Sequence, residues 1–135
     1  MQGTWTLNGS SISTTSDANK KHNIQLISIE YETLFNNLIP RLYQYNDGTS
    51  NRIHTGFIAQ EVEQAILAAD LTTQDLAAYM QVTSKAENGK EESYLTLRYE
   101  EFIALNTYMI QKQQKRIDEL ETTVKLLQNK LNSLA

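Results

Sequence analysis

The stretch that decides the fold is "IALNTYMIQKQQKRIDELETTVKLLQNKLNSLA", residues 103–135. Apolar residues recur there every seven positions, and leucines fill a second apolar position in the later repeats. A heptad with β-branched residues at position a and leucine at position d is typical of a coiled-coil seam. The predicted seam consists of Ile103, Asn106, Ile110, Gln113, Ile117, Leu120, Val124, Leu127, Leu131 and Leu134.

The number of helices in this coil is not fixed by the seam alone. β-branched residues at a with leucine at d favour a parallel dimer, but the two early d positions hold the polar Asn106 and Gln113. Polar layers weaken a seam while they specify its register and oligomeric state, so the count stays open. Arg116 at position g can reach Glu121 at position e of a partner helix. The alternative is that the stripe packs against the body of its own chain.

Upstream of the seam, residues 17–101 mix helical and strand patterns. The segment 17–39 begins with a possible Asp17 cap and ends before Pro40, whose ring cannot continue a helix. Its apolar residues are spaced as on a helix, which predicts a helix over this segment. These residues are Leu26, Ile29, Leu34, Leu38 and Ile39.

Further elements follow from local patterns. "RLYQYNDG", residues 41–48, predicts a strand that closes on a turn at Asp47-Gly48, and "GFIAQEVEQAILAAD", residues 56–70, predicts a helix. Residues 79–82 and 94–97 alternate on either side of Asn88-Gly89, which predicts a β-hairpin. Residues 1–15 indicate short extended structure. The apolar face of the predicted helix consists of Ile58, Val62, Ala65, Ile66 and Ala69.

The sequence therefore predicts an α+β fold: mixed helices with a β-hairpin, followed by a long C-terminal helix that forms a coiled coil. We expect three parts, an upstream region over residues 1–16, a mixed domain over 17–101 and the coiled-coil helix over 102–135. The apolar stripes within the mixed domain are expected to form its core.

Composition excludes several classes of function. The chain has 135 residues with 12 basic and 16 acidic side chains, a net charge of −4, and no cysteine, so disulfides and thiolate metal sites are excluded. No basic block is present to bind nucleic acid, and no segment has the apolar length of a secretion signal or membrane span. His22 and His54 lack partners at metal-ligand spacing. We expect a soluble, mildly acidic protein without metal or cofactor.

One polar segment, "TTSDANKKHNI" at residues 14–24, combines a serine with lysines. A serine hydroxyl becomes a good nucleophile only when a base takes its proton, and lysine serves as that base only when it is neutral. A tight turn would bring Ser16 and Lys21 together, and like-charge repulsion from Lys20 would favour the neutral amine. The same spacing also fits a solvated polar turn.

Four motifs together resemble a known family. "TSDANKKHNI" (residues 15–24) matches a Ser-Asp-x-Arg-x-Lys motif followed by Asn-Ile, and "LIPRLYQYNDG" (residues 38–48) is similar to Pro-x-x-Tyr-x-Tyr-x-Asp-Gly. "HTGFIAQEVEQ" (residues 54–64) and "LTLRYEEFIALNTYMIQKQQKRIDELE" (residues 95–121) complete the set in the right order. They resemble the C-terminal intramolecular chaperone domains of phage tailspikes and tail fibres, auto-processing domains of the endosialidase type that are classed as a serine peptidase family. The resemblance covers about residues 13–121.

The resemblance implies a function in assembly. Such a domain ends a homotrimeric fibre or spike, helps three chains to associate in register, and is cut off between Ser16 and Asp17 once the trimer has folded. Ser16 would be the nucleophile and Lys21 its base, supported by Lys20 and Asn19. Asn19 stands where the family usually has arginine, so cleavage here would be slower or would rely on Lys20.

The same resemblance implies the partners and the place of action. It favours a trimer over the dimer that the heptad pattern alone suggests. The partners would be two further copies of the chain and the upstream fibre domain, with neither nucleic acid nor membrane. The precursor would assemble in the host cytoplasm, and the chaperone fragment would be released there after cleavage.

The chemistry of the cut has open alternatives. Attack by the Ser16 hydroxyl on its own carbonyl would need a four-membered ring, whereas attack on the Thr15 carbonyl would cut one residue earlier. A water activated by the pair, or a serine from a neighbouring subunit, would cut after Ser16. Backbone N–H groups of the turn are the expected oxyanion donors. Two other functions remain, a trimerisation module that does not cleave and a hydrolase of foreign substrates. The second lacks a His/Asp set and a glycine-rich phosphate loop.

Overall fold

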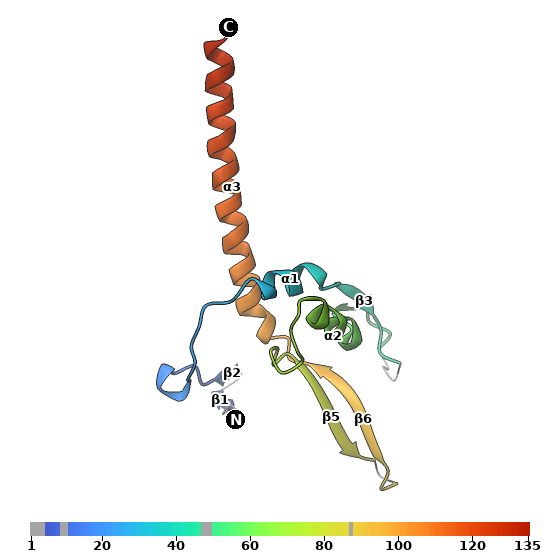
Figure 1. Cartoon of the computed structure of the whole chain (residues 1–135). Helices are drawn as coiled ribbons and strands as arrows, with labels where there is room; N and C mark the ends of the chain where they lie inside the picture. Colours follow the sequence, from blue (N-terminus) through green and yellow to red (C-terminus); the bar gives the residue numbers. More distant parts are fainter. Residues whose placement is uncertain (1–4, 9–10, 47–49, 87) are drawn as a thin grey trace.

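The computed structural model describes residues 5–8, 11–46, 50–86 and 88–135. Two short helices lie at the base of a long helix that extends away from them (Figure 1). The helices are α1 (Glu30–Asn37), α2 (Ala59–Ala68) and α3 (Glu101–Ser133), and a 3-10 turn, η1, spans Ala18–Lys20. The strands pair in three antiparallel hairpins: β1 (Trp5–Asn8) with β2 (Ser11–Thr14), β3 (Arg41–Tyr43) with β4 (His54–Gly56), and β5 (Tyr79–Lys85) with β6 (Glu91–Leu97). The predicted α+β class is confirmed.

The hairpin predicted around Asn88-Gly89 is confirmed as β5–β6. Its register pairs Tyr79 with Leu97 and Val82 with Tyr94. Gly89 adopts a positive φ of 77°, a conformation that glycine reaches without the clash a Cβ would cause. The turn residues thus fix the register, which in turn decides which side chains of the hairpin face the helices.

Two further predictions agree with the structure. The predicted helix of residues 56–70 is α2, and its predicted apolar face is buried at Val62, Ala65, Ile66 and Ala69. The predicted strand is β3, which pairs with β4. The turn predicted at Asp47-Gly48 lies outside the described residues.

The helix predicted over residues 17–39 is wrong in its first half. Asp17 caps only the 3-10 turn η1, and α1 begins at Glu30. Asn23 has a φ of 52°, a left-handed conformation that an α-helix cannot contain. The side chain of Leu26 is 97% exposed, so the predicted apolar face does not exist there. Residues 21–28 instead form an irregular link between η1 and α1, with a bend at Asn23.

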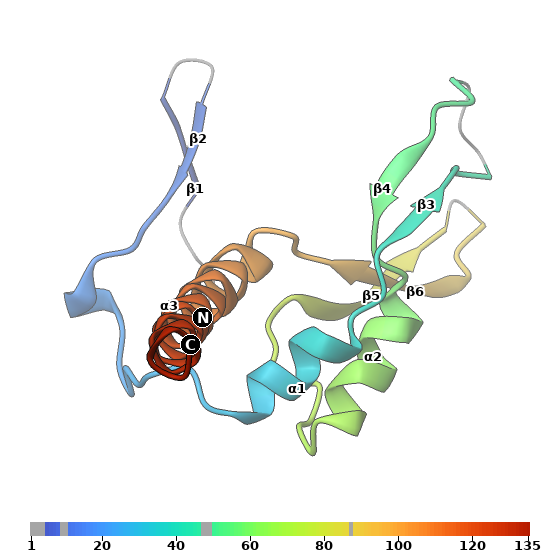
Figure 2. The ribbon, with the colours of Figure 1, turned by 90° about the horizontal axis from the view of Figure 1, so that it is seen from above.

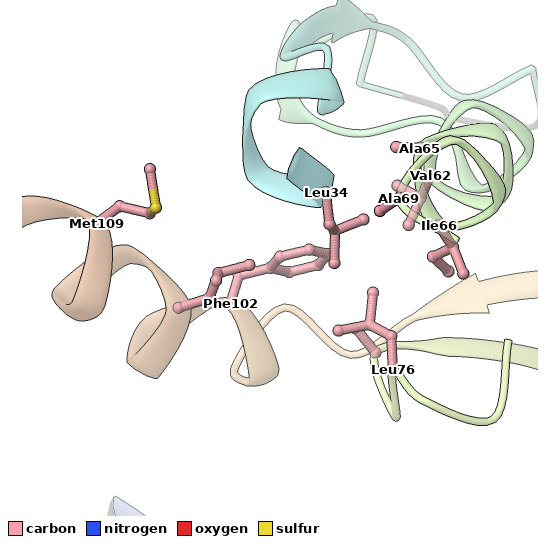
Figure 3. Close-up of a cluster of buried hydrophobic side chains, with 10 residues drawn as sticks. Leu34, Val62, Ala65, Ile66, Ala69, Leu76, Phe102 and Met109 are labelled. Carbon is pink, nitrogen blue, oxygen red and sulfur yellow. The ribbon is translucent and has the colours of Figure 1, made fainter. Parts of the chain in front are cut away.

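A small apolar core lies where α1, α2 and the start of α3 meet. Figure 3 shows Phe102 of α3 directed toward Leu34 of α1, with α2 beyond it. Phe102, Leu105 and Met109 lie on one face of α3 at helical spacing, so the predicted coiled-coil segment begins inside the core. The buried residues are Leu34, Val62, Ala65, Ile66, Ala69, Leu76, Ala78, Phe102, Leu105 and Met109.

Tyr99 ties the β3–β4 hairpin to the start of α3. The Tyr99 hydroxyl accepts a hydrogen bond from the Phe57 amide at 3.1 Å. A Cβ on Gly56 would lie 3.1 Å from Tyr99 Cζ and 3.2 Å from Tyr43 Cε1, so only glycine allows this close approach. The Gly-Phe pair of the third motif therefore has a packing role.

A polar contact holds α3 against α1 just beyond the core. The Glu32 carboxylate accepts hydrogen bonds from the Tyr108 hydroxyl, at 2.8 Å, and from the Lys112 ammonium. The Lys112 bond, and then the Tyr108 bond, hold the pKa of Glu32 below its ordinary value, because both stabilise the charged carboxylate. Glu32 thereby fixes the direction in which α3 leaves the body.

Candidate functional site

Ser16 and Lys21 meet across a tight turn. Asp17 and Lys21 flank η1 in extended conformations, so the chain reverses between them. Lys21 Nζ donates a hydrogen bond to Ser16 Oγ at 2.8 Å. The structure therefore brings together the two residues to which the resemblance assigns nucleophile and base, although their roles stay predictions.

The backbone of this turn is largely engaged in its own hydrogen bonds. The Lys20 amide donates to the Asp17 carbonyl at 3.0 Å, and the Lys21 amide donates to the Ala18 carbonyl at 3.1 Å. The Asn19 amide donates to the Asp17 carboxylate at 2.9 Å. These three N–H groups are therefore not available as oxyanion donors in this conformation. Of the expected donors in the turn, only the Ala18 amide is left, because the Asp17 nitrogen is itself part of the peptide bond that is expected to break.

The supporting residues occupy different places. Asn19 Nδ2 donates to the same Asp17 oxygen as its own amide, at 3.1 Å. Lys20 ends η1, and its side chain makes no hydrogen bond or ion pair within the described part of the chain. Asn19 thus contacts the turn directly, whereas Lys20 contributes only its charge.

The whole segment 14–23 is exposed in the single chain. A lysine amine becomes neutral most readily where burial or a nearby cation disfavours its charged form. The single chain offers Lys21 no buried surroundings. Ser16 and Lys21 therefore have the hydrogen-bonded geometry expected of a Ser-Lys pair, but they lack the buried environment that would favour a neutral lysine.

The link between η1 and α1 was missed by sequence reasoning. Residues 21–28 form neither helix nor strand, and Ile24 and Leu26 are both exposed, whereas Ile27 packs against the core. The period of two in Ile24 and Leu26 was the available signal, but the spacing of three from Leu26 to Ile29 also fits a helix. In Figure 2, which views α3 end-on, this link passes beside α3 and connects the turn to the body.

The predicted seam is free in the single chain. All of its apolar members are between 48% and 83% exposed, and its polar members Asn106 and Gln113 are exposed as well. The alternative that the stripe packs on its own body is therefore wrong. Arg116 pairs with Glu119 of the same helix at 3.4 Å, an exposed contact of little strength that leaves Arg116 able to turn toward a partner's Glu121.

The β1–β2 hairpin contacts no other described element. Both views show it apart from the helical body, joined to it through the segment that carries η1 (Figures 1 and 2). The turn with Ser16 and Lys21 thus lies between two separate parts of the chain, where a cut would divide them.

Other kinds of site find little support. The described residues contain no group of three His, Asp or Glu side chains placed to hold a metal ion. His22 is exposed, and His54 stacks on Tyr43 with ring centroids 5.7 Å apart. In the described ranges, no helix has both the length and the apolar character that crossing a membrane requires.

Comparison with known proteins gives a consistent result. No curated protein matches the chain. A solved structure described as a novel intramolecular chaperone has a TM-score of 0.62 at 19% identity, covering 75% of this chain and 99% of its own. The carboxy-terminal domain of the bacteriophage T5 L-shaped tail fibre, with its intramolecular chaperone domain, has a TM-score of 0.55 at 16% identity and covers 92% of this chain. This chain spans 34% of the length of that tail-fibre chain.

The family assignment rests on the sequence, since structures at this identity show the fold alone. Residues 16–71 match the peptidase family described as chaperone of endosialidase. The match begins at Ser16 and contains the first three of the four motifs, while the helix-leading motif lies beyond it. The resemblance that the motifs indicate is therefore confirmed: residues 16–71 match the family model described as chaperone of endosialidase, and the fold is similar to that of solved structures with intramolecular chaperone domains.

Proposed function

We propose that this chain is the intramolecular chaperone of a bacteriophage tail fibre or spike, which trimerises the fibre and then releases itself by cutting between Ser16 and Asp17. The observation that carries the proposal is the 2.8 Å hydrogen bond from Lys21 Nζ to Ser16 Oγ, at the first residue of the family match. The fold supports the chaperone role, because one similar solved structure is described as an intramolecular chaperone and the other as a tail-fibre domain with its intramolecular chaperone domain.

The exposed seam of α3 supports a role in assembly. Each apolar side chain of the seam loses contact with water when helices associate, which favours association by about 25 cal/mol per Å² of apolar surface. Joining the C-termini of three chains raises their effective concentration to about the millimolar range. Fibrous β-structure needs this help, because distant contacts form only after loop-closure entropy has been lost.

The number of chains in the proposed assembly is three. The polar Asn106 and Gln113 lie at neighbouring layers on the exposed face. A polar layer specifies register and oligomeric state, and the family resemblance favours a trimer. The same proposal places the precursor in the host cytoplasm, where the three chains meet before the mature fibre is released from its chaperone.

The proposed reaction is hydrolysis of one peptide bond. The bond between the Ser16 carbonyl carbon and the Asp17 nitrogen breaks, the carbon gains a hydroxyl from water, and the amine of Asp17 gains a proton. Lys21, when neutral, takes the proton that water or a serine hydroxyl loses on attack and returns it to the leaving amine. Because a four-membered ring prevents attack by Ser16 on its own carbonyl, the attacking oxygen is that of a water or of Ser16 from a neighbouring chain.

Cleavage is proposed to wait for assembly. Ser16 and Lys21 are already in contact in the single chain, but the turn that holds them is exposed. Packing of a second chain over this turn would exclude water and favour the neutral amine of Lys21. The cleaved fibre then lacks its assembly aid. It is kinetically trapped in its folded state, because it can no longer refold by the route that formed it.

The decisive experiment is mass spectrometry of the purified chain and two variants. We expect the wild type to yield a fragment that starts at Asp17, and we expect Ser16→Ala and Lys21→Ala to stay intact. Lys20→Ala is the comparison variant: it removes a neighbouring exposed lysine that makes no hydrogen bond to Ser16, and it should still be cut, but more slowly, because it loses the like charge that favours the neutral amine of Lys21. Full-rate cutting of Lys21→Ala contradicts the assigned base, and a fragment that starts at Ser16 indicates attack on the Thr15 carbonyl instead.

A trimerisation module that never cleaves is the second candidate. The complete exposure of residues 14–23 in the single chain favours it, because an exposed lysine is normally charged and inert as a base. In that case the wild type assembles into trimers and keeps its full-length mass. The same mass measurement, made on material shown to be trimeric by sedimentation, separates the two functions.

A further inference from the structure

The Asp17 carboxylate organises the turn that carries Lys21. One of its oxygens, Oδ1, accepts hydrogen bonds from the amide of Asn19 at 2.9 Å and from Asn19 Nδ2 at 3.1 Å. Asp17 is thus the N-cap of η1, with φ and ψ of −67° and 129°. The carboxylate spans the first half of the turn and satisfies an amide that the turn cannot pair internally.

This cap matters because the turn is too short to be stable alone. A 3-10 turn of three residues fixes several dihedral angles for few hydrogen bonds, and nucleation of such a turn is unfavourable. In η1 the backbone contributes only the bonds from Lys20 and Lys21 to the two preceding carbonyls. Without the cap, the chain between Ser16 and Lys21 loses the reversal that returns the Lys21 side chain to Ser16.

We infer that Asp17 is a positioning residue for self-cleavage and that it acts through Asn19 to hold Lys21 Nζ on Ser16 Oγ. This inference rests on the proposed function, and it gives the residue on the leaving side of the cut bond a task beyond supplying the amine. It also accounts for Asn19 in place of the family's usual arginine, because an amide and a guanidinium both donate hydrogen bonds to a carboxylate. Lys20 needs no part in this arrangement.

The test compares cleavage rates of single variants in the full chain. Asp17→Ala removes the cap and should slow fragment release about 3- to 30-fold, the range expected for loss of an N-cap. Asp17→Asn keeps an acceptor oxygen at the same place and should cleave within about 2-fold of the wild type, since asparagine caps as well as aspartate. Asn19→Ala keeps the backbone bond and loses one side-chain bond, so we expect an intermediate rate.

Two controls separate positioning from folding and assembly. All of these side chains are exposed, so every variant should form trimers that sediment like the wild type. In a Ser16→Ala background, which is not expected to cut, the rate of hydrogen exchange of the Asn19 amide measures how well its hydrogen bond to the Asp17 carboxylate is formed. Adding Asp17→Ala to that background should speed this exchange, and adding Asp17→Asn should not.

The outcomes distinguish the inference from the proposed function. Cleavage of Asp17→Ala at the wild-type rate overturns the inference and leaves the proposed function intact. Equal slowing of Asp17→Ala and Asp17→Asn also overturns it, because that result assigns the effect to the charge of Asp17 and not to the cap. A wild-type trimer that stays intact overturns the proposed function itself, and a Ser16→Ala chain that is still cut contradicts the assigned role of Ser16.

Discussion

Two parts of α3, residues 101–109 and residues 110–133, belong to one continuous helix but differ in what they contact. Its first turns bury Phe102, Leu105 and Met109 in the core of their own chain. From residue 110 onward every side chain is exposed, including the apolar seam. The first part is buried when the chain folds, whereas the second part packs on no other described part of the single chain. Under the proposed function, a single helix would therefore couple the folding of one chain to the assembly of several.

The largest effect is expected from charges placed in the exposed part of α3, residues 110–133. Ile117→Asp combined with Val124→Asp would bury carboxylates in the seam, and each unpaired buried charge costs several kcal/mol. The concentration for half-assembly should rise at least about 1,000-fold, measured by sedimentation equilibrium. Leu126→Asp is the matched control: Leu126 is 59% exposed and Val124 49%, but only Val124 lies in the seam. Equal loss of assembly in the control would contradict the predicted heptad register.

The part of α3 that is buried in the core, residues 101–109, is tested by substituting two neighbouring residues. Phe102 is 3% exposed and Ile103 is 65% exposed. In a chain kept monomeric by the charged seam, Phe102→Ala should lower the free energy of unfolding by about 3–5 kcal/mol, because it leaves a cavity in the core. Ile103→Ala should change it by less than about 0.5 kcal/mol. Denaturant unfolding measures both changes in the free energy of unfolding. Similar losses for the two variants would contradict the described burial of Phe102 and exposure of Ile103.

A smaller effect is expected where the body joins α3. Gly56→Ala would press a methyl group against the rings of Tyr99 and Tyr43 and should lower the free energy of unfolding by about 1–3 kcal/mol. Adding Tyr99→Phe removes the hydroxyl that accepts from Phe57 and frees part of the space, so the double variant should lose less than the sum of the two. Strict additivity in thermal unfolding would contradict the close approach.

The smallest effect concerns Glu32 of α1, which contacts Tyr108 and Lys112 where the buried and exposed parts of α3 meet. Its pKa is lowered in the folded chain by hydrogen bonds from Lys112 and Tyr108, so the unfolded chain binds a proton at higher pH than the folded one. The contact therefore stabilises the fold above the ordinary range of a glutamate and is lost as the pH falls below about 4. The melting temperatures of wild type and Glu32→Gln should converge between pH 6 and pH 3, whereas an offset that stays constant with pH would contradict this account. Glu92→Gln, on the exposed strand β6, is the control.

Local patterns predict much of this fold. The β5–β6 register follows from alternation and the Asn-Gly turn, and the buried face of α2 follows from helical spacing. The helix expected from Asp17 onward was wrong, because Leu26 and Ile29 fit a helical spacing while Ile24 and Leu26 equally fit an extended one. The left-handed Asn23 decided between them, and no periodicity reports it.

The candidate site was predictable in part. Ser16 and Lys21 were singled out from their spacing and the family motif, and the structure places them in contact. The hydrogen bonds from Asn19 to the Asp17 carboxylate were not foreseen, because a cap and a solvated turn have the same composition. The double use of α3 was also missed, since Phe102, Leu105 and Met109 lie between the heptad positions and their burial depends on where α1 and α2 pack.

The hydrogen bond between Ser16 and Lys21 spans the bond that is proposed to break. A cut between Ser16 and Asp17 would leave the serine at the new C-terminus of the fibre and carry the lysine away on the departing fragment. The reaction would dismantle its own catalyst, so neither product could attack a second chain or remake the bond. A host cell filled with released fragments would then hold no active protease, and its other proteins would need no protection from one.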